Sequence, residues 1–398
     1  MSVWIAVAVA VLFVAERALR WYAGRRVAQL DRRIKDLEAR AAAAAAGTSG
    51  AATALDPTAL DPTAFGLPAR ADLDTGRGAP PTSASRAADR ARAAARSGDW
   101  TPWAAHLAGA GTDWNERHLR IEALARHAVE DDTWLRNWLR RQPDSPDAAV
   151  VHAATLATRI GALRAIQPER RLHQEELRTL RLLLDEALPA CTRAATLAPD
   201  DPSPWAWRLE VALGRSRTEF DAILRKAVDR APHHYGAHRS AFRHRTPMPT
   251  EPVEPMIAFV ERIAATAPPE SLLSGLVLEA LLAVDARQQD FAAWTTPAAR
   301  RAVDRVLADL GTVPADDPRA AELRHLVAYG LTHDGRYAEA VEQFRLIGRH
   351  VGSPPWSWAS DPAAWFGTVR NRALAGWDAA GRPAPPEPPG PRSAVGAG

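Results

Sequence analysis

The chain has few lysines and a single cysteine, and these absences exclude several kinds of chemistry. Of its 50 basic residues only Lys35 and Lys226 are lysines, and Cys191 is the only cysteine. An intramolecular disulfide is therefore impossible, and Schiff-base chemistry has only two places in which to occur. Lys226 lies in a run, 220–230, that reads as an amphipathic helix. The motifs G-x-x-x-x-G-K-[ST] and G-x-G-x-x-G are absent, which excludes P-loop and Rossmann nucleotide binding.

The charge balance gives no support for a nucleic-acid partner. The 398 residues are 46% hydrophobic and carry a formal charge of only +3, which suits a folded protein of about two domains. Residues 1–46 hold eight basic and four acidic side chains, so the positive excess lies there and the remainder is close to neutral. A nucleic-acid-binding domain is expected to carry its basic residues on the folded part. We therefore expect no nucleic-acid partner.

Residues 1–24 are predicted to be a membrane anchor. The run 3–15 is apolar without a break, and extending it to Tyr22 gives about 20 residues, enough for a bilayer. Trp4 and Trp21 stand at its ends, where interfacial aromatic residues are common. An interfacial helix and a cleaved signal peptide remain alternatives. Because the flanking arginines all follow the segment, the positive-inside rule predicts a single-pass protein of the cell membrane with the bulk of the chain in the cytoplasm.

Residues 25–46 are predicted to form a short coiled-coil helix. Apolar residues over 27–44 follow a 3-4 spacing for fewer than three heptads. This seam would make the protein a homodimer beside the membrane. At this length a solvated helix that extends the anchor fits the pattern equally well.

Two segments have the composition of disordered chain. Residues 47–83 are rich in Ala, Pro, Thr, Asp and Gly and repeat the pentapeptide ALDPT at 54–58 and 59–63. Such a segment contains too little apolar surface to offset its loss of conformational entropy. We therefore predict a linker over 47–83 and, by the same argument, a Pro-rich tail over 381–398.

Residues 84–380 contain a repeat that predicts helical hairpins. Three septets end in Ala-Pro after a basic residue, RAATLAP at 193–199, KAVDRAP at 226–232 and RIAATAP at 262–268. Their prolines are spaced by about 34 residues, the period of tetratricopeptide repeats, in which a proline follows the second helix of each hairpin. After the first septet, Asp200, Asp201 and Ser203 are predicted to cap the next helix around Trp205.

A fourth unit lies near the C-terminus, in AYGLTHDGRYAEAVEQF. Gly335 is predicted to end its first helix in the left-handed conformation, and Phe344 belongs to the apolar face of its second helix. The small residues Ala328 and Ala340 would let the two helices approach closely. Because no segment shows period-2 alternation, we predict an all-α fold of tetratricopeptide-like hairpins, a solenoid or compact array, with Trp205, Phe220, Leu224 and Phe344 in the core.

Several tryptophan-rich marks resemble an uncharacterised tetratricopeptide-like family of high-GC bacteria. The resemblance covers roughly residues 97–285 and is carried by GDW at 98–100, DW at 113–114, WLRNWL at 134–139, APDDPSPW at 198–205 and APHHYGAH at 231–238. The sequence then continues as RHRTPMPTE, which departs from the aromatic, glycine-containing turn associated with such proteins. The family has no established activity, so the resemblance implies a fold and transfers no site.

The histidine-rich turn at 233–244 is the candidate for a metal site. His234 and His238 are four residues apart, with His233 and His244 nearby, but the segment lacks the Glu of H-E-x-x-H and a third local ligand. We therefore predict that His234 and His238 cap and pack a helix at a repeat boundary, and we assign no metal, cofactor or catalytic residue.

Other conspicuous residues are predicted to belong to the core. Cys191 is expected to be a buried, unreactive thiol. The run 272–284 is apolar but too short for a second membrane span and contains Glu279, so it is predicted to be a buried helix. Core packing is the preferred interpretation for the clustered tryptophans, with a peptide-binding groove as the alternative. These are Trp134, Trp138, Trp205, Trp207, Trp356, Trp358 and Trp365.

Two classes of function fit these features. An anchor, a linker and helical repeats together predict a membrane-tethered, non-catalytic scaffold that binds a protein or peptide partner. The alternative is a metal-dependent or other hydrolytic enzyme that uses the turn at 233–244.

Overall fold

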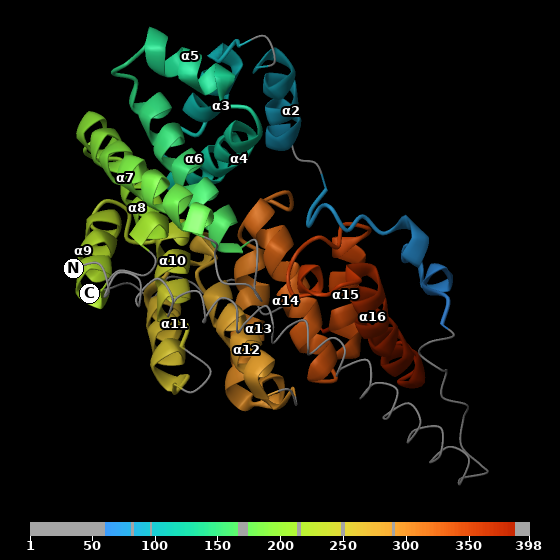
Figure 1. The fold of residues 1–398 in the computed structure, drawn as a ribbon. Coiled ribbons are helices and arrows are strands. Elements are labelled where there is room, and N and C mark those ends of the chain that lie inside the picture. The colour runs from blue at the N-terminus through green and yellow to red at the C-terminus, as the bar shows by residue number, and fades with distance from the viewer. Residues whose placement is uncertain are drawn as a thin grey trace. The chain divides into compact units, whose positions relative to one another are not determined.

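The computed structural model describes residues 60–80, 83–95, 98–165, 174–212, 216–247, 251–288 and 291–386. These residues form fifteen α-helices and five short 3-10 helices, and they include no β-strand (Figure 1). The all-α prediction is therefore confirmed for this part of the chain. The predicted anchor, residues 1–24, and coiled coil, residues 25–46, lie outside it. Within the described ranges, no helix is long and apolar enough to cross a membrane.

The described residues fall into two compact units, the first over 83–252 and the second over 60–80 and 253–386. The α-helices of the first unit are α2 (Ser83–Ala95), α3 (Thr101–Ala108), α4 (Trp114–Glu130), α5 (Thr133–Arg141), α6 (Pro146–Ala165), α7 (Gln174–Leu197), α8 (Ser203–Ala212), α9 (Arg217–Val228) and α10 (Tyr235–Arg245). Those of the second are α11 (Glu254–Thr266), α12 (Gly275–Gln288), α13 (Pro297–Leu310), α14 (Pro318–His333), α15 (Tyr337–Ile347) and α16 (Pro362–Ala379). The 3-10 helices, all in the second unit, are η1 (Pro62–Phe65), η2 (Arg70–Asp72), η3 (Pro269–Ser271), η4 (Ala292–Thr295) and η5 (Trp356–Trp358).

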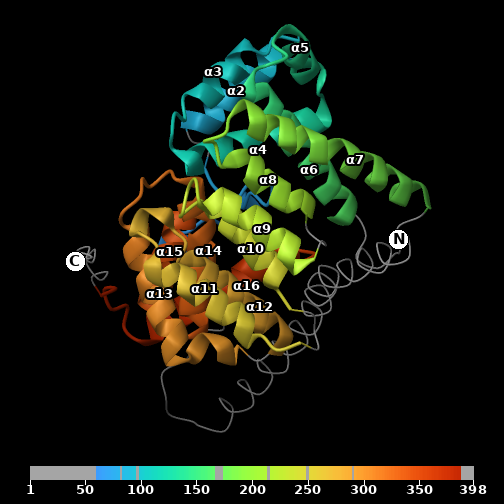
Figure 2. The ribbon, with the colours of Figure 1, turned by 90° about the vertical axis from the view of Figure 1, so that its left-hand side faces the viewer.

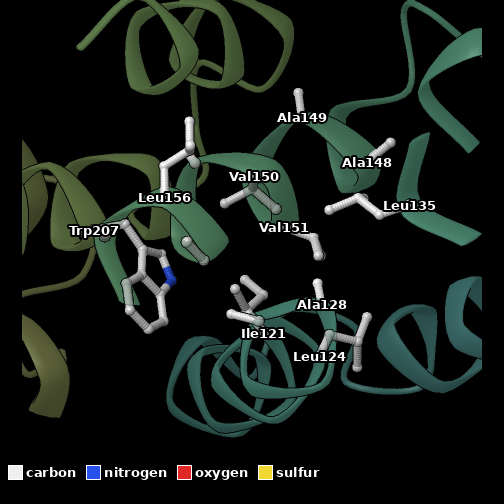
Figure 3. Close-up of a cluster of buried hydrophobic side chains, with 14 of the residues drawn as sticks. Ile121, Leu124, Ala128, Leu135, Ala148, Ala149, Val150, Val151, Leu156 and Trp207 are labelled. Carbon is white, nitrogen blue, oxygen red and sulfur yellow. The ribbon is translucent and has the colours of Figure 1, made fainter. Parts of the chain in front are cut away.

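Alternate helices of the first unit play alternate structural roles. The even-numbered helices α4, α6, α8 and α10 form a row in which each packs against the next. The odd-numbered helices α5, α7 and α9 each pack against the even-numbered helices before and after them, as α7 does beside α6 and α8 (Figure 2). In the core of this unit, Ile121 and Leu124 of α4 face Val150 and Val151 of α6 (Figure 3). Helix α4 also contacts α8 and α10, so the row is curved and its later helices pack against its first.

The three Ala-Pro septets mark the ends of helices, as predicted. Helices α7, α9 and α11 end within them, at Leu197, Val228 and Thr266. Gly335, after α14, has a φ of 78°, the left-handed conformation expected there. Ala328, Ala340, Phe220 and Phe344 are fully buried, whereas Trp205 and Leu224 are only half-buried.

The capping prediction before α8 is right for one residue of three. Asp201 caps the helix, because its Oδ1 accepts a hydrogen bond of 2.7 Å from the backbone N–H of Ser203. Asp200 is exposed, and the Ser203 hydroxyl is buried without a hydrogen-bond partner. Asp201 takes this role because its carboxylate is buried beside the free N–H groups of the first turn, whereas Asp200 is exposed.

The second unit is built around an aromatic core. The ring of Tyr329, on α14, lies 5.6 Å from that of Trp294 and 5.7 Å from that of Trp356, and the ring of Phe344 lies 5.3 Å from that of Phe366. Helix α12 is buried as predicted, although it begins at Gly275 and not at Leu272, which has a φ of 57°.

Residues 60–80, which we call the strap, correct the linker prediction. The predicted linker spans 47–83, yet the strap packs against the rest of the second unit, residues 253–386, and buries Pro62 and Leu67. Asp74 pairs with the chain around His350 in an isolated parallel bridge, and the guanidinium of Arg370 donates 2.7 Å to the carbonyl oxygen of Pro68. Composition predicted disorder because the segment lacks a core of its own, but its backbone groups are satisfied by partners that lie about 250–300 residues away.

Candidate functional site

The histidines of the predicted turn serve separate structural tasks. His234 is the N-cap of α10, where its Nδ1 accepts a hydrogen bond of 3.1 Å from the Ala237 N–H. His238 Nε2 lies 2.6 Å from the carbonyl oxygen of Pro232, so this nitrogen carries the proton and donates. The His244 ring stacks on Phe220 with centroids 3.9 Å apart. His234 therefore caps α10 and His238 packs against the turn before it, which are the structural roles predicted for these two residues.

These side chains do not converge on one point in space. In the parts of the chain that the structure describes, no three His, Cys, Asp or Glu side chains are arranged to hold a metal ion. Burial lowers the pKa values of His238 and His244, which keeps both rings neutral near pH 7.

Helix α4 brings polar side chains to this turn that lie more than 100 residues away in sequence. The side-chain amide of Asn115 accepts a 2.7 Å hydrogen bond from the Tyr235 N–H and donates one of 3.4 Å to the His233 carbonyl oxygen. We call the set formed by Asn115, Arg117, His118, Asp201, Trp207 and His234 the α4 junction. Sequence reasoning missed its α4 members; the DW mark at 113–114, next to them, was the only signal nearby.

His118 lies at the centre of the junction. Its ring stacks on Trp207 with centroids 4.9 Å apart and meets His234 edge-on at 5.0 Å. Gly236 allows this approach, because a Cβ at that position would lie 2.4 Å from His118 Nε2. Burial lowers the pKa of His118, against the opposing influence of the Glu122 and Glu210 carboxylates. The ring is therefore a neutral packing element, comparable to an aromatic side chain.

Arg117 joins three even-numbered helices by charge. Its Nε donates a hydrogen bond of 2.8 Å to the carboxylate of Asp201, before α8. Its Nη2 donates one of 2.7 Å to the carboxylate of Asp147, at the start of α6. Arg117 and Asp201 are 7% and 4% exposed. Burial alone would lower the pKa of Arg117, but the two carboxylates outweigh that effect and raise it. Asp201 thus binds both the first turn of α8 and the guanidinium of α4.

Two side chains of the first unit that could act as nucleophiles, Ser240 and Cys191, are hydrogen bonded or buried. The hydroxyl of Ser240, on α10, is hydrogen bonded to Glu210 and not to a histidine nitrogen. Cys191 is 1% exposed, and burial raises the pKa of its thiol to about 12, so it is the buried, protonated residue that was predicted. The hydrogen bonds of the junction link α4 to residues at or before the starts of α6, α8 and α10.

The tryptophans divide between core and surface. Trp134, Trp138, Trp207 and Trp356 are buried, as the core interpretation predicted. Trp205 and Trp365 are half-buried, and Trp358 is 39% exposed. Trp205 is distinguished by its neighbours, because the cationic groups of Arg208, Lys226 and Arg230 lie 4.5–5.6 Å from its ring centroid.

Comparison of the chain with known protein families, with curated proteins and with solved structures finds no match.

Proposed function

We propose that this chain is a membrane-tethered, non-catalytic scaffold whose tetratricopeptide-like hairpins bind a protein or peptide partner. The observation that carries the proposal is the alternation in the first unit, where α4, α6, α8 and α10 form one row and α5, α7 and α9 pack behind it. Stacked two-helix units in which each contacts its neighbours are the architecture of helical repeat proteins, whose extended surfaces serve as binding platforms.

The polar chemistry of the first unit supports a scaffold over the hydrolytic alternative. The two histidines with metal-ligand spacing each use a ring nitrogen to bind backbone, at Ala237 and at Pro232. The buried guanidinium of Arg117 is neutralised by Asp147 and Asp201. Groups held in this way rigidify the packing of helices, which a platform requires.

The tether is the part of the proposal that rests on sequence. The apolar segment 3–15 and the arginines that follow it would place the anchor in the cell membrane with the helical units in the cytoplasm. The seam over 27–44 would pair two copies. The strap gives such a tether a point of attachment on the second unit.

Crosslinking in intact membranes tests the proposal. The full chain, carrying a photo-crosslinking residue at an exposed position such as Arg225, is expected to capture the same protein in independent preparations. A chain that ends at residue 83, with the photo-crosslinking residue placed at Thr58 of the predicted linker, supplies the control, since it keeps the predicted anchor, coil and linker but lacks the helices. Capture by the control alone, or by neither chain, would contradict the scaffold.

The hydrolytic alternative has its own test. Purified full-length protein and the double variant His234→Gln, His238→Gln are compared for bound metal. We expect the same metal content in both and a loss of stability of about 1–3 kcal/mol, typical of lost caps and packing. A stoichiometric metal that only the wild-type protein carries would make the enzyme the leading hypothesis.

A further inference from the structure

Three cationic side chains surround one indole ring on the first unit. The Lys226 ammonium lies 4.5 Å from the Trp205 ring centroid, and the guanidinium carbons of Arg230 and Arg208 lie at 5.5 and 5.6 Å. Trp205 and Arg208 belong to α8, Lys226 belongs to α9, and Arg230 follows α9 directly. We call these four residues the Trp205 patch.

The charges of the patch are not neutralised by the described part of the chain. None of its three cations forms an ion pair with a carboxylate there. Arg230 donates to the carbonyl oxygens of Pro199 and Lys226, and Arg208 donates to the hydroxyl of Thr192. These neutral acceptors fix the orientation of the guanidinium groups but leave their charge. By contrast, Arg117 in the same unit has two carboxylate partners.

We propose that the Trp205 patch binds an acidic segment of the protein partner, a short peptide stretch whose Asp or Glu carboxylates pair with Lys226, Arg208 and Arg230. The inference rests on the proposed function and names the chemistry of its partner. Carboxylates would supply the counter-charges that the fold itself does not, and the indole offers an apolar face beside them. The guanidinium groups are held in place before binding, so little of their freedom is lost.

The surroundings favour a peptide over a membrane surface. Asp200 and Asp229 are exposed at the borders of the patch, next to Pro199 and Arg230. A continuous anionic bilayer would bring many charges close to these carboxylates, whereas a short acidic segment brings only a few. The half-buried Trp205 ring is enclosed by cations and does not project as an interfacial anchor would.

Fluorescence anisotropy with the full-length protein in a neutral detergent tests the proposal. The probe is a fluorescein-labelled ten-residue peptide of alternating Glu and Ser, and the reference is the same peptide with Gln in place of Glu. We expect the Glu peptide to bind at least tenfold more tightly, with an affinity that falls as salt is raised toward about 0.5 M. Equal affinity for both peptides would overturn the proposal.

Two neighbouring residues of α9 provide matched variants. Lys226→Gln removes a cation that faces Trp205, and Arg225→Gln removes the same charge from the adjacent exposed position. We expect Lys226→Gln to weaken binding about fivefold or more and Arg225→Gln to change it less than about twofold, because an exposed charge acts over short distances. Equal losses in the two variants would overturn the proposal.

The ring and the competing ligand are tested separately. Trp205→Leu keeps an apolar side chain but removes the π face on which the cations rest. We expect this variant to bind the Glu peptide severalfold more weakly, with a circular dichroism spectrum like that of the wild type. Tighter binding of short-chain phosphatidylserine than of the Glu peptide, abolished by Lys226→Gln, would assign the patch to lipid headgroups and overturn the proposal. The crosslinking experiment in membranes does not depend on Lys226. If it captures a partner while the Glu peptide fails to bind, the proposal for the Trp205 patch is rejected and the scaffold function is not.

Discussion

At the scale of single residues, the fold depends on polar side chains that act as joints between helices. Asn115 and Arg117 bind backbone or carboxylate groups of other helices or turns, and His234 accepts a hydrogen bond from the first turn of the helix that it caps. Each is placed where an apolar residue would leave a helix end or a carboxylate without a partner. Such side chains stabilise the fold mainly by providing hydrogen-bond partners, because a buried polar group without a partner raises the free energy of the folded state.

Arg117 provides the sharpest test of this view. Arg117→Met keeps most of the volume but leaves Asp201, 4% exposed, and Asp147 without their cation. We expect a loss of about 3–5 kcal/mol in the free energy of unfolding, measured by urea denaturation. Arg126→Met removes a mostly exposed i,i+4 pair with Glu122 and is expected to cost less than about 0.5 kcal/mol. Similar costs for the two variants would show that the junction is dispensable.

His325 predicts how stability depends on pH. Trp356 Nε1 donates a hydrogen bond of 2.9 Å to His325 Nδ1. The proton of His325 is therefore on Nε2, which donates a hydrogen bond of 2.9 Å to the Gly78 carbonyl oxygen. Burial lowers the pKa of His325 from 6.5 to about 4. Between these values the unfolded chain binds a proton that the folded chain does not, so falling pH favours unfolding. The stability is fully present above about pH 6.5 and is lost toward pH 4.

Protonation of His325 is expected to lower the free energy of unfolding by on the order of 3 kcal/mol between pH 7 and pH 4. Urea midpoints of the wild type and of His325→Gln, compared between pH 4 and 7, measure it. The variant is expected to be less stable at pH 7 and to lose less on acidification. Parallel pH profiles for the two proteins would contradict the assignment.

At the scale of elements, close backbone approach decides where the strap lies. The Gly352 N–H donates 2.8 Å to the Arg77 carbonyl oxygen, and a Cβ on Gly352 would lie 2.7 Å from the Arg77 carbonyl carbon. A side chain there would collide with backbone, which cannot yield as a flexible side chain can. Glycine is therefore required at 352 for contact between strap and unit, and not for its backbone freedom.

Gly352→Ala is expected to detach the strap around residue 77. Limited proteolysis should cleave within 70–80 several times faster than in the wild type, and the protein should lose about 1–3 kcal/mol of stability from the overpacked contact. Gly76→Ala is the control, because its Cβ would meet only Asp74 Oδ1 at an ordinary 3.4 Å. Equal protection of the strap in both variants would contradict this account.

At the scale of the whole molecule, the proposed tether predicts that the helical units lie on the cytoplasmic side of a membrane. A reporter fused after Ala46 is expected to be active in the cytoplasm and inactive outside it, since every flanking arginine follows the apolar segment. Reversing the charge bias by placing arginines before Val3 and replacing those at 17, 20, 25 and 26 should export the reporter. Export of the unaltered fusion would refute the proposed topology. Deleting residues 1–24 should release folded protein from the membrane fraction.

The sequence by itself determined the helical class, several helix ends and much of the core. Period and proline position act locally: the residues that end α7, α9 and α11 are neighbours of the prolines that follow them, and Gly335 alone supplies its left-handed turn. Burial of Phe344 and Cys191 followed from apolar periodicity, and the capping role of His234 followed from its place before a helix.

Only the tertiary structure decided which distant groups meet. The strap read as disordered because composition reports the apolar surface of a segment and not the hydrogen bonds that partners such as His325 and Arg370 supply. The α4 junction was invisible because Arg117 and Asp201 are 84 residues apart, and a charge in a sequence does not say which charge it will face. The Trp205 patch arises in the same way, since α8 and α9 must pack before Lys226 and Arg208 share one ring. Local propensities act through neighbouring residues, whereas sites are formed by long-range packing, and the energy of that packing appears only when the helices are in contact.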